Sequence, residues 1–345
     1  VGLSISPEHA SRYERSRRIV NMSSCRKVTI EECEILSVRD ASLWSKDDWN
    51  DLACDGMLLD GREHTIRNNY VKNVAFGIRG GAESSLVEYN TIENFAGDGL
   101  RGLADNMVFQ YNTVKNCYDV NGNHDDGFQS WSRPAGGSVG SGTRRGIVLR
   151  GNTIINYEDP GQPFRGTLQG IGCFDGMFED WVVENNLIVV DHWHGITLRG
   201  AKNCRIVNNT IVDPNATHPG PPWIRLDRHK NGTPSSGCVV RNNLAGDYSM
   251  RSPEDLTMDH NIEFDRPEEL FRDYRGGDFR LRPGCEAVDA GSSEQAPDRD
   301  IAGVARPRGS AFDIGAYEFF QAPTAAAPSL RIPAHGSTPS RPHGV

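Results

Sequence analysis

Residues 65–71 read Thr-Ile-Arg-Asn-Asn-Tyr-Val, and the same order of residue types returns six more times along the chain. Each copy places apolar side chains at fixed positions on both sides of one asparagine, which is Asn69 in this first copy. The later copies are residues 86–92, 108–114, 148–154, 182–188, 205–211 and 239–245. Weaker copies occur at 28–35, with Cys33 in the asparagine position, and before Asn261. Such repetition predicts a solenoid of stacked structural units.

The intervals between the repeated asparagines predict the size of one coil. They are 21, 22, 40, 34, 23 and 34 residues, and they separate Asn69, Asn90, Asn112, Asn152, Asn186, Asn209 and Asn243. The short intervals fit three short strands with turns, at about 3.3 Å per residue. Asparagine suits a coil corner because it tolerates left-handed backbone and its amide can bond the asparagines of neighbouring rungs. We therefore predict an all-β, single-stranded right-handed parallel β-helix with about 21–23 residues per minimal coil.

A second column follows each asparagine strand, as glycine, an apolar residue and then a polar or small one. It occurs at residues 77–79, 99–101, 127–129, 170–172 and 195–197. Because adjacent rungs lie about 4.8 Å apart, the residues before these glycines should stack into one row on the next strand. That row is Phe76, Asp98, Asp126, Gln169 and His194, and the row after the apolar position is Arg79, Arg101, Gln129, Gly172 and Thr197. A purely structural sheet does not require this many charged groups on one face, so the two rows indicate a functional surface.

The long intervals predict loops that leave the coil and wall a binding face. Intervals of 34 to 40 residues hold roughly 12 to 18 residues beyond a minimal coil, and insertions in solenoids tend to lie on the binding face. The loops between residues 112 and 243 contain the run His124-Asp125-Asp126, and an earlier insert spans 33–69. Five of the six tryptophans lie in the inserts or beside the glycine column, where their rings could stack on sugars.

Composition limits the partners. The net charge of −9 argues against a nucleic acid as the main partner, and no apolar run is long enough to span a membrane. The chain begins Val1-Gly2-Leu3, without an initiator Met or a signal peptide, as a processed form or a trimmed sequence would, so the start of the chain does not bear on export. We expect a protein of bacterial type that is secreted, periplasmic or attached to the cell surface. Capped ends favour a monomer.

The eight cysteines contain no Cys-x-x-Cys pair of the kind that zinc sites use. Cys204 and Cys238 each stand five residues before a repeat asparagine, so they should stack one rung apart. A disulfide and a pair of free buried thiols are both compatible with that position.

The C-terminal part departs from the repeat. Residues 278–319, which run from Asp278 to Phe319, resemble the terminal segment of many secreted bacterial β-helix proteins. We predict one domain over residues 1–320, in which a cap at about 262–320 closes the last coil, because a solenoid needs an atypical terminal unit. Residues 321–345 are rich in Pro, Ala and Ser and are expected to form a disordered tail.

The coil pattern and the end segment together resemble the pectin-lyase-like right-handed β-helix superfamily, over roughly residues 20–320. That superfamily includes polysaccharide lyases, glycoside hydrolases, alginate epimerases and phage tailspikes, so the resemblance implies a fold more than an activity. The order of charged residues also resembles that of polygalacturonases, through Asp98, Asp125-Asp126, His194-Gly195 and Arg205-Ile206. It departs from their motifs at Ala96, Trp193 and Val207, and by a whole extra rung.

The leading functional expectation is an extracellular lyase that cleaves an acidic, uronate-containing polysaccharide by β-elimination. An arginine would pair with the substrate carboxylate, or a calcium ion held by Asp98, Asp125 and Asp126 would do so, and a histidine would take the proton. The candidate catalytic residues are Asp98, His124, Asp125, Asp126, His194 and Arg199. The candidate substrate-binding residues are Arg79, Arg101, Gln129, Trp131, Gln169, Asp175, Trp193, Trp223 and Arg225.

An alternative is a glycoside hydrolase that uses two carboxylic acids. Asp98 and Asp126 on adjacent rungs would lie about 5 Å apart by backbone spacing, which should raise one pKa and provide an acid. A uronan C5-epimerase and a non-catalytic glycan-binding β-helix are further alternatives. No cofactor other than calcium is indicated.

Overall fold

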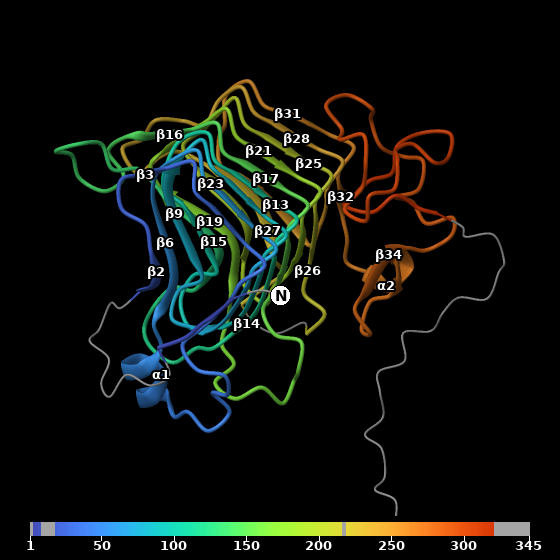
Figure 1. Ribbon diagram of the computed structural model, residues 1–345. Coiled ribbons are helices and arrows are strands. Elements are labelled where there is room, and N and C mark those ends of the chain that lie inside the picture. Colours follow the sequence, from blue (N-terminus) through green and yellow to red (C-terminus); the bar gives the residue numbers. More distant parts are fainter. Residues whose placement is uncertain (1–2, 8–17, 216–218, 321–345) are drawn as a thin grey trace, which may run out of the picture.

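The computed structural model describes residues 3–7, 18–215 and 219–320, and over them the chain winds into a parallel β-helix (Figure 1). Successive coils stack in sequence order, and each adds one strand to each of three long sheets. The predicted fold class is confirmed. The predicted tail at 321–345 lies outside the described residues.

The three long sheets are named here sheets I, II and III, in the order in which one coil visits them. Sheet I contains β2 (Arg18–Asn21), β6 (Asp55–Arg62), β9 (Ile78–Glu83), β12 (Leu100–Gly102), β15 (Asp126–Trp131), β19 (Gln169–Asp175), β23 (His194–Arg199), β27 (Trp223–Asp227) and β30 (Asp247–Met250), with β3 (Cys25–Arg26) beside β6. Sheet II contains β4 (Thr29–Glu31), β7 (Thr65–Arg67), β10 (Leu86–Glu88), β13 (Val108–Gln110), β17 (Val148–Arg150), β21 (Val182–Glu184), β25 (Arg205–Val207), β28 (Val239–Arg241) and β31 (Thr257–Asp259).

Sheet III contains β1 (Ser4–Ile5), β5 (Glu34–Leu36), β8 (Tyr70–Val74), β11 (Thr91–Phe95), β14 (Thr113–Cys117), β18 (Thr153–Ile155), β22 (Leu187–Val189), β26 (Thr210–Val212), β29 (Leu244–Ala245) and β32 (Ile262–Glu263). The shorter elements are α1 (Lys46–Leu52), α2 (Pro267–Leu270), the sheet of β16 (Thr143–Arg145), β20 (Met177–Glu179) and β24 (Ala201–Lys202), and the antiparallel pair β33 (Phe271–Asp273) and β34 (Asp278–Leu281).

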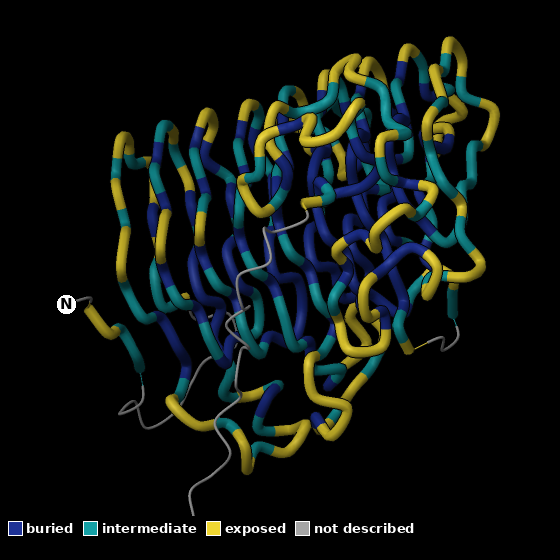
Figure 2. Tube along the Cα trace, turned by 90° about the vertical axis from the view of Figure 1, so that its right-hand side faces the viewer, coloured by how far each residue is buried: buried dark blue, intermediate teal, exposed yellow. Residues whose placement is uncertain are grey.

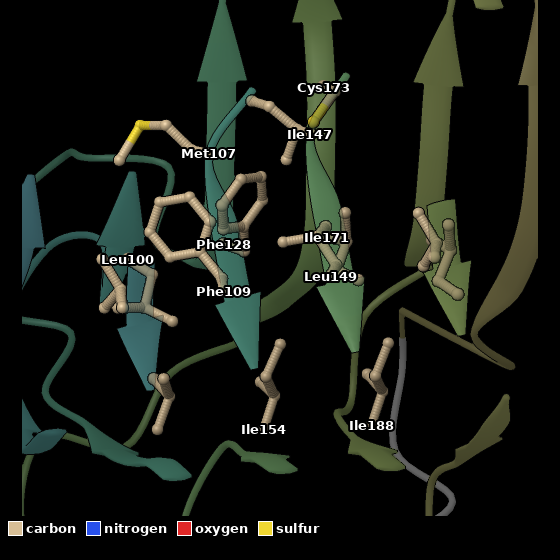
Figure 3. Close-up of a cluster of buried hydrophobic side chains, with 14 of the residues drawn as sticks. Leu100, Met107, Phe109, Phe128, Ile147, Leu149, Ile154, Ile171, Cys173 and Ile188 are labelled. Carbon is tan, nitrogen blue, oxygen red and sulfur yellow. The ribbon is translucent and has the colours of Figure 1, made fainter. Parts of the chain in front are cut away.

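The interior of the coil is filled by columns of apolar side chains that stack in register. On sheet I, Leu100 is level with Phe128, and Phe128 is level with Ile171. Figure 3 shows this column beside Phe109 and Leu149 of sheet II. All five side chains are at most 1% exposed. The turns and loops carry most of the exposed residues, as Figure 2 shows.

The glycine column of sheet I allows a close approach between coils. A side chain at Gly127 would place its Cβ 2.4 Å from Ile154 Cγ2 and 2.9 Å from the carbonyl oxygen of Gly170. Gly99 and Gly170 are restricted in the same way by the next rung. The residues that precede these glycines therefore stack in one row from coil to coil.

The asparagine ladder is confirmed. Asn69 Nδ2 donates a hydrogen bond to Asn90 Oδ1 at 2.9 Å, and Asn90 Nδ2 donates to Asn112 Oδ1 at 3.0 Å. The same contact continues through every later repeat asparagine to Asn261, at 2.9 to 3.1 Å. At the first rung the N–H of Cys33 donates to Asn69 Oδ1.

The expected backbone of the ladder asparagines is wrong. The left-handed conformation belongs to the residue before each of them, as at Asn68 (φ 55°), Tyr89 (φ 53°) and Tyr111 (φ 54°). In each turn the left-handed residue faces outward, and the ladder asparagine directs its amide into the buried corner. Asparagine is therefore needed at the ladder position for its hydrogen bonds and not for its backbone freedom.

The long loops leave the coil at both edges of sheet I. Residues 37–54, 118–125, 156–168 and 213–222 connect sheet III to sheet I, and residues 132–147 connect sheet I to sheet II. In Figure 1, α1 lies at one edge of this sheet and the loop carrying β16 at the other. The predicted loops therefore border one sheet, from its two sides.

The C-terminal segment does not close the last coil as expected. Leu270, Phe271, Phe279 and Ile314 pack against side chains on the outer face of sheet III, which are Leu187, Val189, Val212 and Leu244. Figure 1, viewed nearly along the axis, shows this segment beside the solenoid rather than over its end. Apolar residues on the outer face of β22, β26 and β29 explain the position, because they leave a surface that only another layer can bury.

Two smaller findings complete the fold. All eight cysteines are free, and Cys204 and Cys238 are buried side by side on adjacent rungs, as free thiols. Within the described residues, no helix has the length and apolar character needed to cross a membrane.

Candidate active site

The candidate site lies on the outer face of sheet I, over β12, β15, β19 and β23. On three rungs the residue before the glycine contacts the residue three positions later. Arg101 donates to Asp98, Gln129 Nε2 donates to Asp126 Oδ2 at 2.7 Å, and His194 Nδ1 lies 2.8 Å from Thr197 Oγ1. The two rows predicted from the glycine column are thus paired across each rung.

Asp98 and Asp126 lie on adjacent rungs, as predicted, but neither reaches solvent. The N–H of Asp126 donates to Asp98 Oδ1 at 3.2 Å, and the two residues are 2% and 0% exposed. Burial raises the pKa of both carboxyl groups, and the charge of Asp98 raises the pKa of Asp126 further. Arg101 opposes this shift at Asp98.

Asp126 combines full burial with an unsatisfied oxygen. Its Oδ1 has no hydrogen-bond partner among the described residues, and neither has Oε1 of Gln169, which is level with it on the next strand. Any side chain at Gly172 would collide with Asp126 Oδ1, so the carboxyl group occupies the space that this glycine leaves. A neutral, protonated Asp126 is the form that this site favours, because an isolated buried carboxylate is costly.

Asp125 is 7% exposed and is the member of this acidic group that lines a cavity. Burial and the neighbouring carboxylates Asp98 and Asp119 raise its pKa to about 7, while a hydrogen bond from the Cys117 thiol opposes the rise. Its Oδ1 accepts no hydrogen bond from the described residues. Asp125 therefore changes its protonation state near neutral pH, as a proton-transferring group must.

A polar cavity of about 100 Å³ opens beside Asp125. It is lined by Asp119, Asn123, His124, Asp125, Thr167, Gln169 and His192. His124 is exposed, whereas Gln169 is 7% exposed. Two carboxyl groups, two imidazoles and two amides thus face one small space, which is a set of groups suited to acid–base chemistry on a hydroxylated ligand.

His192 and His194 are uncharged at neutral pH. Burial is the main reason that the pKa of His192 and that of His194 both fall to about 4. The N–H of His194 donates to His192 Nδ1 at 3.1 Å, so neutral His192 carries its proton on Nε2. His194 itself contacts Thr197 and the indole N–H of Trp223, at 3.3 Å, and does not line the cavity.

Each arginine on this face is paired with an aspartate of the protein. Arg79 Nη1 donates to Asp55 Oδ2 at 2.8 Å, and Arg101 contacts Asp98. Asp227 accepts from both Arg225, at 2.5 Å, and Arg199, at 3.5 Å. These pairs leave little net positive charge for the carboxylate of a substrate, which the lyase expectation required.

The remaining predicted residues lie around the site rather than in the cavity. Trp193 is 45% exposed and stacks on Trp223 with ring centroids 6.2 Å apart. Trp131 lies over the Arg101 guanidinium. Asp175, at the opposite end of β19 from Gln169, pairs with Lys230.

The predicted calcium ligands are already engaged. Asp98 accepts from Arg101, Asp126 accepts from Gln129, and Asp125 accepts from Cys117. In the part of the chain that the structure describes, no group of three His, Cys, Asp or Glu side chains is placed to hold a metal ion. These carboxyl groups as arranged do not fit a calcium site, and a calcium requirement stays a prediction.

The sequence matches the family model described as a right-handed β-helix region, over residues 16–161 and 55–262. The chain belongs to this family. The match confirms the fold implied by the resemblance to pectin-lyase-like proteins.

Several solved structures are similar to this β-helix protein. XylC in complex with xylose is 11% identical with a TM-score of 0.52, and the alignment covers 91% of this chain and 64% of that one. The pectate lyase Pel9A is 18% identical, with a TM-score of 0.39 and coverage of 92% and 86%. An alginate lyase from Paenibacillus sp. str. FPU-7 is 11% identical, with a TM-score of 0.36 and coverage of 75% and 89%. This chain thus spans less than two thirds of the XylC chain. Identities this low concern the fold alone, and no curated protein matches the sequence.

Sequence reasoning missed Asp119 and His192, which line the cavity of this β-helix protein. Asp119 follows β14 at the start of the loop that ends in His124-Asp125, and His192 precedes β23. Their place in the same sheet III to sheet I connections as the predicted residues was the signal that could have found them.

Proposed function

We propose that this protein is a glycoside hydrolase in which Asp125 transfers the proton to the leaving oxygen. The observation that carries the proposal is the position of Asp125, at a polar cavity shared with a second carboxyl group, Asp119. The pKa of Asp125 near 7 keeps a large fraction of this group protonated at neutral pH, as a general acid requires.

The remaining groups of the cavity have defined tasks in this mechanism. Asp125 donates its proton to the glycosidic oxygen as the bond to the sugar carbon breaks. Asp119 then either attacks that carbon or activates a water, and the distance between the two carboxyl groups in the complex sets the stereochemical outcome. The Nε2–H of neutral His192 and the amide of Gln169 can donate hydrogen bonds to sugar hydroxyls.

A lyase for a uronate-containing polysaccharide is the second candidate. The same pKa of Asp125 suits a base that removes the proton beside the substrate carboxylate. The ion pairs of Arg79, Arg101, Arg199 and Arg225 count against it, since β-elimination needs a free positive charge at that carboxylate.

The sign of the pH dependence distinguishes the two candidates. A hydrolase needs protonated Asp125, so kcat/KM should fall as the pH rises through about 7, whereas a lyase needs the ionised form and should gain activity there. The measurement is a screen of neutral and uronate polysaccharides for new reducing ends and for the ultraviolet absorbance of an unsaturated sugar. New reducing ends without that absorbance are the expected result.

Asp125→Asn should lower kcat by at least about a hundredfold while binding is nearly kept. Unchanged turnover by this variant would overturn the role of Asp125. Unchanged configuration and chain length in every polysaccharide tested would instead support a glycan-binding protein, and a changed configuration at constant length an epimerase. Addition of EDTA to the same assays tests for calcium.

We further propose that the protein acts outside the cytoplasm and as a monomer, because a polymeric substrate is met there and one chain carries the whole site. Cell fractionation and analytical ultracentrifugation test these two points.

A further inference from the structure

A second cavity lies on sheet I beside the one at Asp125. Its volume is about 420 Å³, and it is lined by Trp49, Asn50, Asp51, Ala53, Cys54, Asp55, Ala75, Phe76, Arg79, Ala96, Asn121, Gly122 and Asn123. Asn123 lines both cavities, so the two are neighbours along the sheet. The second is the larger, and nothing in the proposed chemistry uses it.

The centre of this cavity is the Arg79–Asp55 ion pair. Asp55 is 6% exposed and accepts a hydrogen bond from Nη1 of Arg79 at 2.8 Å, whereas Nε of that guanidinium has no partner in the described residues. The Nε atom is buried, so a ligand makes its first contact at Nη2.

The charges around the cavity select against an anion. Two carboxyl groups, Asp51 and Asp55, line it with a single arginine, and that arginine is already paired. The amides of Asn50, Asn121 and Asn123 add uncharged donors and acceptors. A carboxylate placed here would meet two like charges, whereas a hydroxyl group can both accept from Arg79 and donate to Asp55.

We propose that this cavity is a subsite for an uncharged sugar unit of the polysaccharide, held through neighbouring hydroxyl groups by Arg79 and Asp55. The inference rests on the proposed glycan-cleaving function and names its substrate class. The polysaccharide carries a neutral sugar one to two units from the cleaved bond, since the Arg79 rung lies two rungs, or about 10 Å, from that of Gln129.

Titration calorimetry on the Asp125→Asn protein tests the subsite without turnover. The probes are xylotetraose, mannotetraose, cellotetraose and galactotetraose, with tetragalacturonate as the charged probe. At least one neutral probe should bind more tightly than tetragalacturonate by tenfold or more. The added Arg79→Gln change should weaken neutral binding by tenfold or more, because hydrogen bonds to a charged group are lost.

Two further variants keep the test sharp if Arg79→Gln folds poorly. The Arg79→Gln/Asp55→Asn pair replaces the ion pair by two amides of similar shape, and it should show the same loss. Asp55→Asn alone frees the charge of Arg79, so it should shift preference toward tetragalacturonate. The control is Arg67→Gln, which breaks an exposed ion pair with Glu31 on sheet II and should leave binding unchanged.

Equal binding by the Arg79→Gln and Arg67→Gln proteins overturns the subsite, and so does tighter binding of tetragalacturonate than of every neutral probe. Turnover of polysaccharides by the protein with Asp125 intact is measured separately. Cleavage without an effect of Arg79→Gln on KM removes the subsite and leaves the hydrolase. Arg79-dependent binding of a neutral probe without cleavage of any polysaccharide removes the hydrolase instead.

Discussion

The carboxyl group of Asp126 is removed from water, although the residue belongs to the outer face of sheet I. Its carboxyl group is fully buried, touches Gln129 through one oxygen and leaves the other without a partner. The row in which Asp126 lies was predicted correctly, but its burial was not. The strand register determines which residues share a row, and it does not determine which residues cover them. The same row therefore yields a buried Asp126, while the loop residue next to it, Asp125, meets the cavity.

The Asp126→Asn substitution should stabilise the protein at neutral pH. Since burial raises the pKa of Asp126 in the folded state, the folded protein holds a proton that the unfolded chain has released above about pH 4. The contribution of Asp126 to the free energy of unfolding therefore keeps its full value below about pH 4. It falls as the pH rises above that, by up to about 1.4 kcal/mol per pH unit. Asparagine does not ionise, so the variant does not lose stability in this way.

Denaturant unfolding of both proteins between pH 4 and pH 7 measures the effect. The difference in the free energy of unfolding should grow with pH in favour of Asp126→Asn. A difference that stays constant over this range would show that Asp126 is ionised in the folded protein.

At the scale of the elements, the asparagine corner was the most predictable part of the molecule. The repeat gave the coil length, the order of the strands and the amide ladder from Asn69 to Asn261, because identical residues at identical phase must stack. It did not give the course of the loops, since Asp119 and His192 belong to no repeat. The C-terminal segment was misplaced because its cap role was inferred from the general need for a terminal unit, whereas the apolar outer residues of β22, β26 and β29 provide the surface that it covers.

Asn112→Ala in the middle of the ladder should cost about 2–6 kcal/mol. The change removes the acceptor for the N–H and the Nδ2 of Asn90, at 3.0 Å each, and leaves both donors buried. Each unsatisfied buried group costs about 1–3 kcal/mol. Thermal and urea unfolding measure the loss.

The matched control is Asn68→Gly, at the exposed left-handed position of the equivalent corner two rungs earlier. Glycine adopts this conformation freely, so the free energy of unfolding should stay within about 1 kcal/mol of the original protein. Equal losses at the two positions would mean that the corner depends on asparagine as a turn residue and not on the ladder.

At the scale of the whole molecule, the C-terminal segment contains a buried ion pair of its own, and hydrogen bonds as well as apolar packing fasten it to the solenoid. Arg306 and Glu318 are 2.8 Å apart, with both side chains fully buried. Arg306 also donates to Asn185 Oδ1 at 3.2 Å, and Asn208 Nδ2 donates to the carbonyl oxygen of Asp313 at 3.1 Å. Left-handed corner asparagines thus serve as attachment points for the segment.

Arg306→Ala should destabilise the attachment by about 3–5 kcal/mol, because it leaves Glu318 buried without its partner. Limited proteolysis should then cut between residues 262 and 320 before it cuts the coils. The control is Arg275→Ala, whose pair with Glu268 is exposed and distant at 3.7 Å, and which should change little. Cleavage of both proteins at one rate would show that apolar packing alone holds the segment.

The loops of this protein can be exchanged without disturbing its frame. The coils from Asn69 to Asn261 are joined by the same amide contact at the corner between sheets II and III, whereas the insertions leave at the two other corners. The inserted loops and the amide ladder are therefore encoded in separate parts of the chain. A loop such as 132–142 could be grafted from another β-helix with the same rung height, and the carboxyl groups beneath would keep their positions.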